Sequence, residues 1–322
     1  MICIHVLMEA DPAAETASTG GWGGARPSLG IERTTYVAIS TADPAAAADF
    51  AVAHMGLALV HADGAGRRYL AAHGLDPYSL VYVPGEKGID HVSYQVADLH
   101  AVFAAEHALA ALGVGTELAE SDLWRHEPAL RVCTPGGHRI ELTPGVRVAA
   151  PMASVVTAPT SVPAPIALDH VVTRVIDVDA ELAFVRGPLG LRESSTISAP
   201  DVGPMLSFHR GAGLLYHCLA VARADRNELH HFQFSLKDGP SVLAAHERMS
   251  SSGEVEMIWG PVRHGPGHNI AFYFRDQPGN FVEYSAEEEV ILSDDAYRPQ
   301  QWSVTDQRSM DEWGTRPPDI FF

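Results

Sequence analysis

Histidine, tyrosine and glutamate side chains that suit metal and acid–base chemistry gather in the last third of the sequence. His264, Tyr273 and Glu283 lie within one stretch, "HGPGHNIAFYFRDQPGNFVE". Upstream, His170 and His231 each occupy a β-like run, "LDHVV" and "LHHFQF". Two imidazoles and one carboxylate that leave other positions open form the facial triad typical of non-haem Fe(II). The sequence therefore predicts a metal site made by His170, His231 and Glu283.

An internal repeat gives these residues corresponding positions in the chain. Four segments share a β-like run, an Asp, a helical run and a closing Gly, and they align on Tyr36, His91, His170 and His231. The Asp residues found seven positions after these anchors are Asp43, Asp98, Asp177 and Asp238. Asp is expected at a helix N-cap because its carboxylate accepts from the free N–H groups of the first turn. The glycines expected to end the helices are Gly56, Gly113, Gly190 and Gly253.

The repeat predicts two modules that were duplicated once. Each half also ends in a Gly-x-x-x-Glu strand, which closes on Glu141 in the first half and on Glu283 in the second. Between them, the stretch 144–165 is rich in Pro, Ala, Val and Thr, as is typical of a linker. We therefore expect a linker at 147–165.

Chemically capable residues are concentrated in the second half. Tyr36 stands where the first half should have its first metal-binding histidine, and a neutral phenol with a pKa of about 10 is a poor ligand. His217, His264 and Tyr273 have no counterparts of the same type in the first half. The first half is thus predicted to be a degenerate copy without catalytic function.

Composition and charge exclude several classes of partner. A chain of 322 residues is expected to form two domains. The 40 acidic residues exceed the 22 basic ones, so neither nucleic acid nor an anionic membrane is expected as a partner. The N-terminus does not resemble a signal peptide, and no apolar run approaches ~18 residues. Three scattered cysteines favour a reducing compartment without a disulfide framework, and we expect a soluble, cytoplasmic protein.

The chain from about residue 31 to 290 resembles the type I extradiol (catechol meta-cleavage) dioxygenases of the vicinal oxygen chelate superfamily. The family signature is a histidine, nine residues to a tyrosine and ten more to a glutamate ligand, which His264, Tyr273 and Glu283 reproduce. By the same resemblance, "LDHVV" and "LHHFQF" provide the ligands His170 and His231. "YHCLAVA" resembles the strand that carries the acid–base histidine of the family, which implies that role for His217.

The resemblance also implies a fold and its divisions. The expected class is α+β, with four βαβββ modules paired into two vicinal-oxygen-chelate domains, each an incomplete β-barrel flanked by helices. The implied divisions are an N-terminal extension at 1–30, a degenerate domain at 31–146, the linker at 147–165, a catalytic metal-binding domain at 166–290 and a C-terminal tail at 291–322. The tail is apolar enough to pack on the body of the protein or on a neighbouring subunit.

The implied reaction is the opening of a catechol-type ring by O2, as the co-substrate, in aromatic-compound catabolism. The implied metal is Fe(II), with Mn(II) as an alternative, and a homo-oligomer is expected. Tyr273 and His264 are then expected to hydrogen-bond the catechol oxygens, and a charged His217 is expected to face O2 and deliver a proton. One departure from the family is the turn that follows Arg275, which reads Asp-Gln-Pro-Gly in place of Asp-Pro-x-Gly.

Two other functions remain open at this point. A glyoxalase-like isomerase or lyase shares the ligand pattern but usually binds its metal through four protein groups, and it does not need His217, His264 and Tyr273 together. A non-enzymatic protein of the bleomycin-sequestering kind lacks a complete set of ligands. Metal content, together with a yellow ring-fission product, would distinguish these functions from a dioxygenase.

Overall fold

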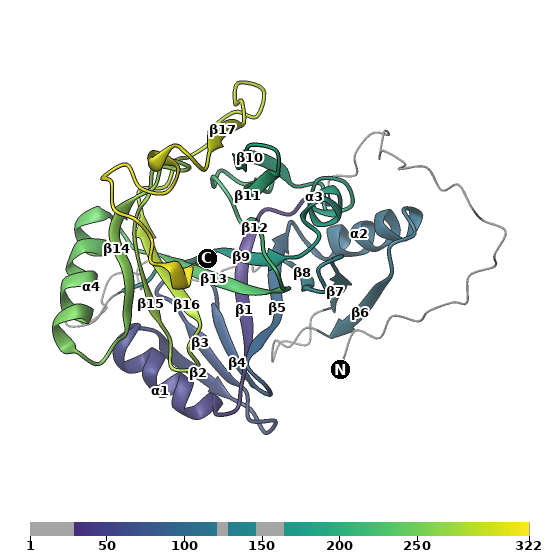
Figure 1. The fold of residues 1–322 in the computed structure, drawn as a ribbon. Helices are drawn as coiled ribbons and strands as arrows, with labels where there is room; N and C mark the ends of the chain where they lie inside the picture. The colour runs from purple at the N-terminus through teal and green to yellow at the C-terminus, as the bar shows by residue number, and fades with distance from the viewer. Residues whose placement is uncertain (1–28, 121–127, 146–163, 322) are drawn as a thin grey trace.

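Four βαβββ modules follow one another in the computed structural model, which describes residues 29–120, 128–145 and 164–321 (Figure 1). The first module contains β1 (Arg33–Thr41), α1 (Pro44–His54), β2 (Ala58–Ala62), β3 (Arg68–Ala71) and β4 (Leu80–Pro84). The second contains β5 (Gly88–Val96), α2 (Leu99–Ala111), β6 (Thr116–Glu120), β7 (Pro128–Cys133) and β8 (Arg139–Pro144). The third contains β9 (Ala167–Val175), α3 (Val178–Arg186), β10 (Arg192–Ala199), β11 (Gly203–Arg210) and β12 (Leu219–Arg223). The fourth contains β13 (Glu228–Ser235), α4 (Gly239–Ser252), β14 (Met257–Arg263), β15 (Ile270–Arg275) and β16 (Phe281–Ala286).

Each half folds into one large sheet with the same strand order. The first sheet runs β2-β3-β4-β1-β5-β8-β7-β6, and the second runs β14-β15-β16-β13-β9-β12-β11-β10. A further strand, β17 (Gln300–Ser303), extends the second sheet beside β10 and is followed by the short helices η2 (Gln307–Ser309) and η3 (Asp319–Phe321). The predicted α+β class with two sheets is confirmed. The extension at 1–30 and the linker at 147–165 fall almost entirely outside the described residues, so the domain boundaries stay predictions.

Asp residues begin the four α-helices, as the repeat predicted. In each helix the N-cap carboxylate accepts from one or two backbone N–H groups of the first turn, a contact worth about 1 kcal/mol; these N-caps are Asp43, Asp98, Asp177 and Asp238. The predicted end of the third helix was wrong, because α3 ends at Gly187 rather than at Gly190. Pro188 explains the early end, since a proline disfavours helical backbone in the residue before it.

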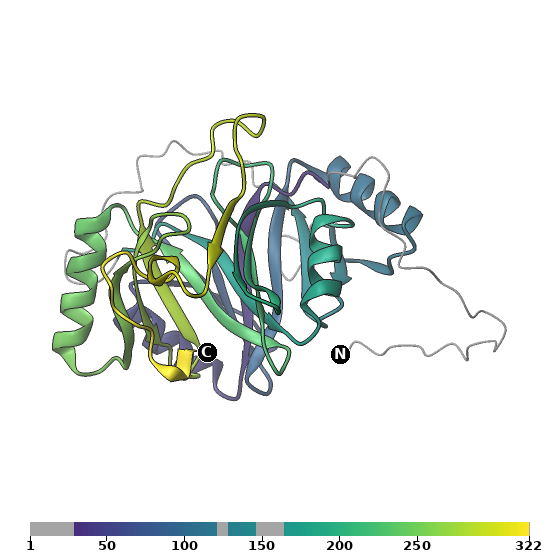
Figure 2. The ribbon, with the colours of Figure 1, turned by 45° about the horizontal axis from the view of Figure 1, so that its top comes forward.

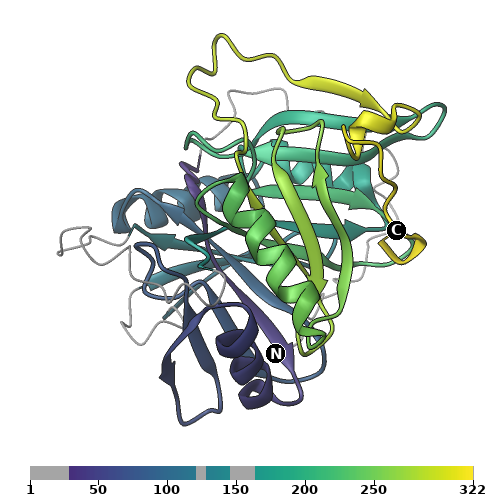
Figure 3. The ribbon, with the colours of Figure 1, turned by 90° about the vertical axis from the view of Figure 1, so that its left-hand side faces the viewer.

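The helices and the sheets share one continuous apolar core. Strand residues on the helix-facing side are almost fully buried, including Val37, Val171, Phe232 and Phe272. In Figure 3, α4 lies across the outer face of the neighbouring strands β14, β15 and β16. The helices therefore cover one face of each sheet, which leaves the opposite face of the second sheet to form a site.

The two halves hold each other through the turns of their last hairpins. The backbone N–H of Gly136 donates to Glu181 in the second half at 2.7 Å, and His138 contacts the carbonyl of Arg174. The corresponding turn of the second half packs on the first, where Tyr82 donates to Asp276 at 3.1 Å and Lys87 donates to the carbonyl of Gly279. The unusual Asp-Gln-Pro-Gly turn is thus an interface between the halves.

Two further expectations concern cysteines and membranes. Cys218 is a free, buried thiol, and the expectation of no disulfide framework stays a prediction because Cys3 lies outside the described residues. No helix among the described residues is long and apolar enough to cross a membrane.

Burial of Asp276 predicts how stability depends on pH. Burial raises the pKa of Asp276 to about 6, although hydrogen bonds from Asn280 and Tyr82 oppose this. A folded pKa above the unfolded value means that the stabilising contribution is present at low pH and is lost as the pH rises through about 6. Asp276→Asn should therefore gain stability relative to the wild type between pH ~4 and ~7, by up to about 3 kcal/mol.

Urea unfolding midpoints at a series of pH values measure this effect. The exposed Asp295 supplies the matched control, because Asp295→Asn also removes a carboxylate but lies outside the buried turn between the halves. A pH-independent difference for Asp276→Asn would contradict the prediction.

Candidate metal centre

Three adjacent strands of the second sheet carry the predicted metal ligands. His170 lies on β9, His231 on β13 and Glu283 on β16, and the sheet order places β13 between the other two. Gln233 lies two residues after His231 on β13, so both side chains project from the same face of the strand. Gln233 pairs with His170 on one side and with Glu283 on the other. Residues paired across neighbouring strands project from the same face of a sheet, so the repeat brings these side chains together.

The ligand atoms converge in a buried position. His231 Nε2 lies 3.0 Å from Glu283 Oε2, and His170 Nε2 lies 3.5 Å from the same oxygen. All three residues are buried, and their ligand atoms lie within 4.8 Å of one another. His231 Nε2 has no hydrogen-bond partner although it is fully buried. Two neutral imidazoles and a carboxylate around one point fit a divalent metal ion, which would satisfy this atom and the carboxylate charge.

Hydrogen bonds orient the carboxylate and the predicted acid–base pair. Asn269 donates to Glu283 Oε1 at 3.1 Å, which leaves Oε2 for the two histidines. His264 Nε2 lies 2.9 Å from the hydroxyl of Tyr273, and His264 Nδ1 lies 2.7 Å from the carbonyl of Met310. Since a carbonyl only accepts, Nδ1 of His264 carries the proton, and its Nε2 accepts from the hydroxyl of Tyr273. Burial and the charge of Glu283 raise the pKa of Tyr273 well above its ordinary value.

His217 lies on the other side of the ligands. The centroid of its ring lies 3.9 Å from that of His170, with the two planes tilted by 34°, and its Nε2 is buried without a hydrogen-bond partner. Burial lowers the pKa of His217 to about 3, so its ring is neutral at pH 7 and not charged as expected from the sequence. His217 Nδ1 lies 2.7 Å from Glu288, a carboxyl whose pKa burial raises well above its ordinary value. A buried carboxyl with a raised pKa thus lies next to the imidazole of His217, and the sequence analysis did not identify Glu288.

His230 also reaches the site, which contradicts strand alternation. Adjacent residues of a regular strand point to opposite faces, so only His231 was expected to face the site. A register shift between Leu229 and His231 interrupts the pairing of β13 with β9. His230 is therefore buried beside His231, with the two Nδ1 atoms 2.5 Å apart. Burial lowers the pKa of His230 well below its ordinary value, as do the nearby His231 and Arg174.

The C-terminal tail packs on the body of the protein and closes a cavity of about 430 Å³ over these residues. Val304, Met310 and Phe321 of the tail line this cavity together with the predicted ligands. Figure 2 shows the yellow C-terminal segment folded back onto the second sheet. The ring of Phe321 packs at 4.8 Å from that of Tyr273 and at 4.7 Å from that of His230. The sequence left open whether the tail packs on the body of the protein or on a neighbouring subunit. In the structure it packs on the body.

In the first half, protein side chains neutralise the equivalent carboxylate, Glu141. Tyr36 donates to Glu141 Oε1 at 2.5 Å, and its hydroxyl also contacts His91 Nε2 at 2.9 Å. Arg131, at the position that corresponds to Tyr273, donates to Glu141 Oε2 at 3.0 Å. Both carboxylate oxygens of the buried Glu141 are thus occupied, and Arg131 supplies the positive charge. Among the described residues, the groups with metal-binding geometry all lie in the second half.

Comparison with known proteins agrees with this geometry. Residues 167–284 match the family model described as the Glyoxalase/Bleomycin resistance protein/Dioxygenase superfamily. Over 155 residues the chain is 32% identical to metapyrocatechase 2 of Cupriavidus necator, a match that covers 48% of this chain and 46% of that protein. The matched region therefore spans about half the length of this relative. A second relative, 3-methylcatechol 2,3-dioxygenase of Pseudomonas putida, is 24% identical over 89% of this chain and 98% of its own.

Solved structures share the fold over nearly the whole chain. Homoprotocatechuate 2,3-dioxygenase from Arthrobacter globiformis superposes with a TM-score of 0.82 and 22% identity, over 93% of this chain and 92% of that one. The 2,3-dioxygenase LapB from Pseudomonas sp. KL28 superposes with a TM-score of 0.76 and 23% identity, over 85% and 98% of the two chains. These likenesses support the two-sheet fold.

The site predicts one metal ion per chain, bound in the second half. Replacing His170, His231 or Glu283 by Ala should remove the metal, because two ligands cannot hold it against buffer. His91→Ala is the matched control, since it removes a buried histidine from the equivalent position of the first half and should leave the metal in place. Metal analysis of purified, dialysed protein measures the content. Two ions per chain, or full content in His231→Ala, would contradict this assignment.

Proposed function

We propose that the protein is an extradiol dioxygenase that opens catechol-type rings with O2, because residues 167–284 match the model of the Glyoxalase/Bleomycin resistance protein/Dioxygenase superfamily. The observation that carries the proposal is the set of groups around one cavity. His170, His231 and Glu283 lie at its centre, with His217 on one side and the pair His264–Tyr273 on the other. Relatives named for catechol cleavage support the same reaction.

The proposed metal is iron(II), held by His170, His231 and Glu283. The chemistry that such an ion supplies is a set of open positions for the diol and O2, together with a redox route around the spin barrier between them. The charge of Glu283 and the neutral imidazoles leave a net +1 at the site, which a catechol monoanion neutralises. The first half, where Arg131 neutralises Glu141, is proposed to hold no metal.

Side chains on two sides of the cavity are proposed to accept a proton from the substrate and to donate one to the O2 side. Tyr273 and His264 form a relay because the hydroxyl of Tyr273 donates to His264 Nε2. A diol hydroxyl that approaches Tyr273 can pass its proton to the phenol oxygen while the proton of Tyr273 moves to His264. On the other side, the buried Nε2 of His217 faces the cavity, and Glu288 lies next to its Nδ1 as a proton source. His217 is thus proposed to deliver a proton on the O2 side.

The cavity favours a neutral, apolar substituent on the ring. Val172, Leu206 and Phe208 line the wall beyond His170. Arg174, four residues along β9 from His170, is already paired with Glu228 at 2.7 Å and with the carbonyl of Phe321 at 2.7 Å. A carboxylate near the ring would lose its water without gaining a free cation.

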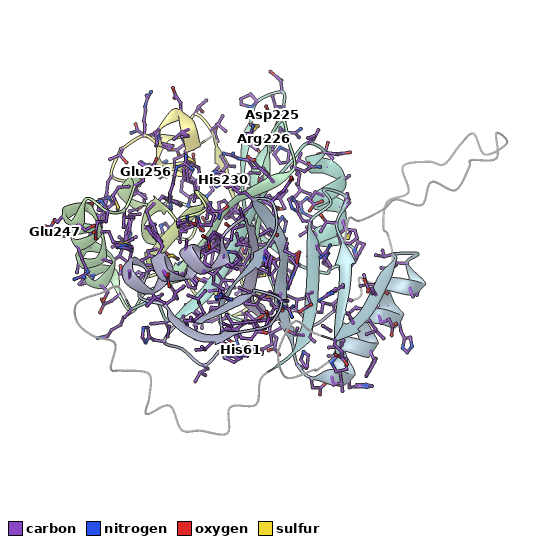
Figure 4. All side chains as sticks on the ribbon, turned by 90° about the horizontal axis from the view of Figure 1, so that it is seen from below. His61, Asp225, Arg226, His230, Glu247 and Glu256 are labelled. Carbon is purple, nitrogen blue, oxygen red and sulfur yellow. The ribbon has the colours of Figure 1, made fainter. Side chains whose placement is uncertain are left out.

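Charged residues at the rim do not change this expectation. Asp225 and Arg226 are exposed and lie next to each other just before β13, with His230 farther along the chain in that strand (Figure 4). Arg226 pairs with Glu228 at 2.9 Å, and Arg223 donates its Nε–H to the carbonyl of Pro204. We therefore propose a catechol with an alkyl or aryl substituent as substrate.

The two other functions leave part of the site unexplained. A binding protein has no use for a proton relay such as His264–Tyr273 beside a complete ligand set. A four-ligand isomerase site needs a further ligand near Glu283, whereas among the described residues only His170 and His231 group with it; His217 and Glu288 form a separate group with His170.

A colour assay tests the proposed reaction. Protein loaded anaerobically with Fe(II) and given 4-propylcatechol should form a yellow ring-fission product when air is admitted, and metal-free protein should not. The kcat/KM for 4-propylcatechol should exceed that for 3,4-dihydroxyphenylacetate by about tenfold or more. The carboxylate of the second substrate loses its water in the cavity without an ion pair in return, and a difference of about 1.4 kcal/mol is enough for a tenfold ratio. No product from any catechol would overturn the function. Preference for the carboxylated substrate would overturn only the substituent.

The variant His217→Phe separates the O2 step from binding. It should keep Fe(II) and bind catechol anaerobically as the wild type does, because His217 is not one of the three ligands. Turnover should fall by about 10²–10⁴-fold, the range of general acid–base effects, because Phe cannot deliver a proton. Stopped-flow mixing of the anaerobic complex with O2 measures the slowed phase.

The buried His138 of the first half supplies the control for this variant. His138→Phe removes an interface contact, so it should lower the unfolding midpoint while turnover per folded molecule stays normal. If His217→Phe behaved in this way too, the proton role of His217 would be wrong.

A further inference from the structure

His230 connects the end of the C-terminal tail to a predicted metal ligand. Its Nε2 lies 2.7 Å from the backbone carbonyl of Phe321, and its Nδ1 lies 2.5 Å from His231 Nδ1. The same carbonyl accepts a second hydrogen bond, from Arg174 Nη2 at 2.7 Å. His230 is 9% exposed, so both contacts are shielded from water.

These partners determine which nitrogen atoms carry protons. A backbone carbonyl only accepts, so Nε2 of His230 must donate to Phe321 and carry the proton. In a neutral imidazole the other nitrogen is bare, so Nδ1 of His230 accepts, and Nδ1 of His231 must donate to it. His231 is then left with a bare Nε2, which is the atom 3.0 Å from Glu283 Oε2.

We propose that His230 is a positioning residue that fixes His231 in its metal-binding tautomer, and that the tail carbonyl of Phe321 fixes His230 in turn. The inference rests on the proposed metal site. Metal-binding histidines generally donate their other ring N–H to a carboxylate, a carbonyl or water, and such partners raise metal affinity. Here the partner is a second histidine, whose own proton is placed by the backbone of the tail.

A simple packing role makes a different prediction. The ring of His230 also packs against Phe281 at 5.9 Å and against Phe321 at 4.7 Å. If packing alone mattered, a ring of similar size would replace His230 without loss of metal. If the tautomer matters, the position of one hydrogen-bonding atom decides the result.

Three substitutions separate these roles. The amide of Asn lies near the position of histidine Nδ1, so His230→Asn keeps an acceptor for His231 and loses the contact with Phe321. The amide of Gln lies near the position of Nε2, so His230→Gln keeps the tail contact and loses the acceptor. His230→Phe keeps the ring and loses both hydrogen bonds.

Competition with a chelator measures the dissociation constant of each protein for Fe(II), and for Zn(II) as an oxygen-insensitive probe. His230→Gln and His230→Phe should bind metal about 10–100-fold more weakly than the wild type, the usual cost of losing such a partner. His230→Asn should stay within about threefold. The matched control is His209→Gln. His209 is a buried histidine of the same sheet that hydrogen-bonds Ser207, and the protein with this substitution should bind metal as tightly as the wild type.

The results that overturn the proposal are clear. Wild-type affinity in His230→Gln or His230→Phe would leave only packing, and equal losses in all three variants would show that no single atom matters. Absence of metal from the wild type would instead overturn the proposed function.

Hydrogen exchange of the wild type tests the link to the tail without any substitution. Coupling between two sites is reciprocal, so metal binding should slow exchange of the backbone N–H groups in residues 319–321. This slowing should be lost in His230→Asn, where the connection to Phe321 is broken. Unchanged exchange in the wild type on metal loading would overturn the coupling to the tail.

Discussion

A buried carboxylate that must be neutralised is the constraint on which the rest of the structure depends. Glu283 is 2% exposed and faces two imidazoles across 3.0 and 3.5 Å. An unpaired charge in such a place is very costly, so the site requires a cation or a proton between these atoms. The position of that positive charge is set by the strands that carry the three side chains. The helices and the apolar core behind the sheet hold these strands in place.

The first half meets the same constraint with different chemistry. Glu141 is fully buried at the equivalent position, and its two oxygens receive Tyr36 and Arg131. Arg131 brings its charge permanently, because guanidinium does not lose its proton in proteins. A metal brings charge together with open positions for a substrate. The two halves therefore share one electrostatic arrangement, in which the buried carboxylate is neutralised by Arg131 in the first half and by the proposed metal in the second.

The repeat made most of the fold and the grouping of His170, His231 and Glu283 predictable, because strand pairing and helix capping depend on short, local patterns. Asp43, Asp98, Asp177 and Asp238 begin helices for the same reason at each position. The features that sequence reasoning missed depend on irregularity or on distant contacts. His230 required a strand bulge, and Glu288 and Phe321 required chain segments beyond the last repeated strand to fold back. The neutral state of His217 depends on burial, which no spacing reveals.

The tail supplies part of the lining of the cavity in the second half. After β16, the chain adds β17 beside β10, and its later residues contact His264 through Met310 and His230 through Phe321. After β8, the chain instead continues toward β9 and the second half. The two carbonyl contacts each fix the proton of a histidine, one in the proposed relay and one next to the proposed metal. A segment without titratable groups at these contacts can thus determine which ring nitrogen of His230 and of His264 carries a proton, because a backbone carbonyl accepts at every pH.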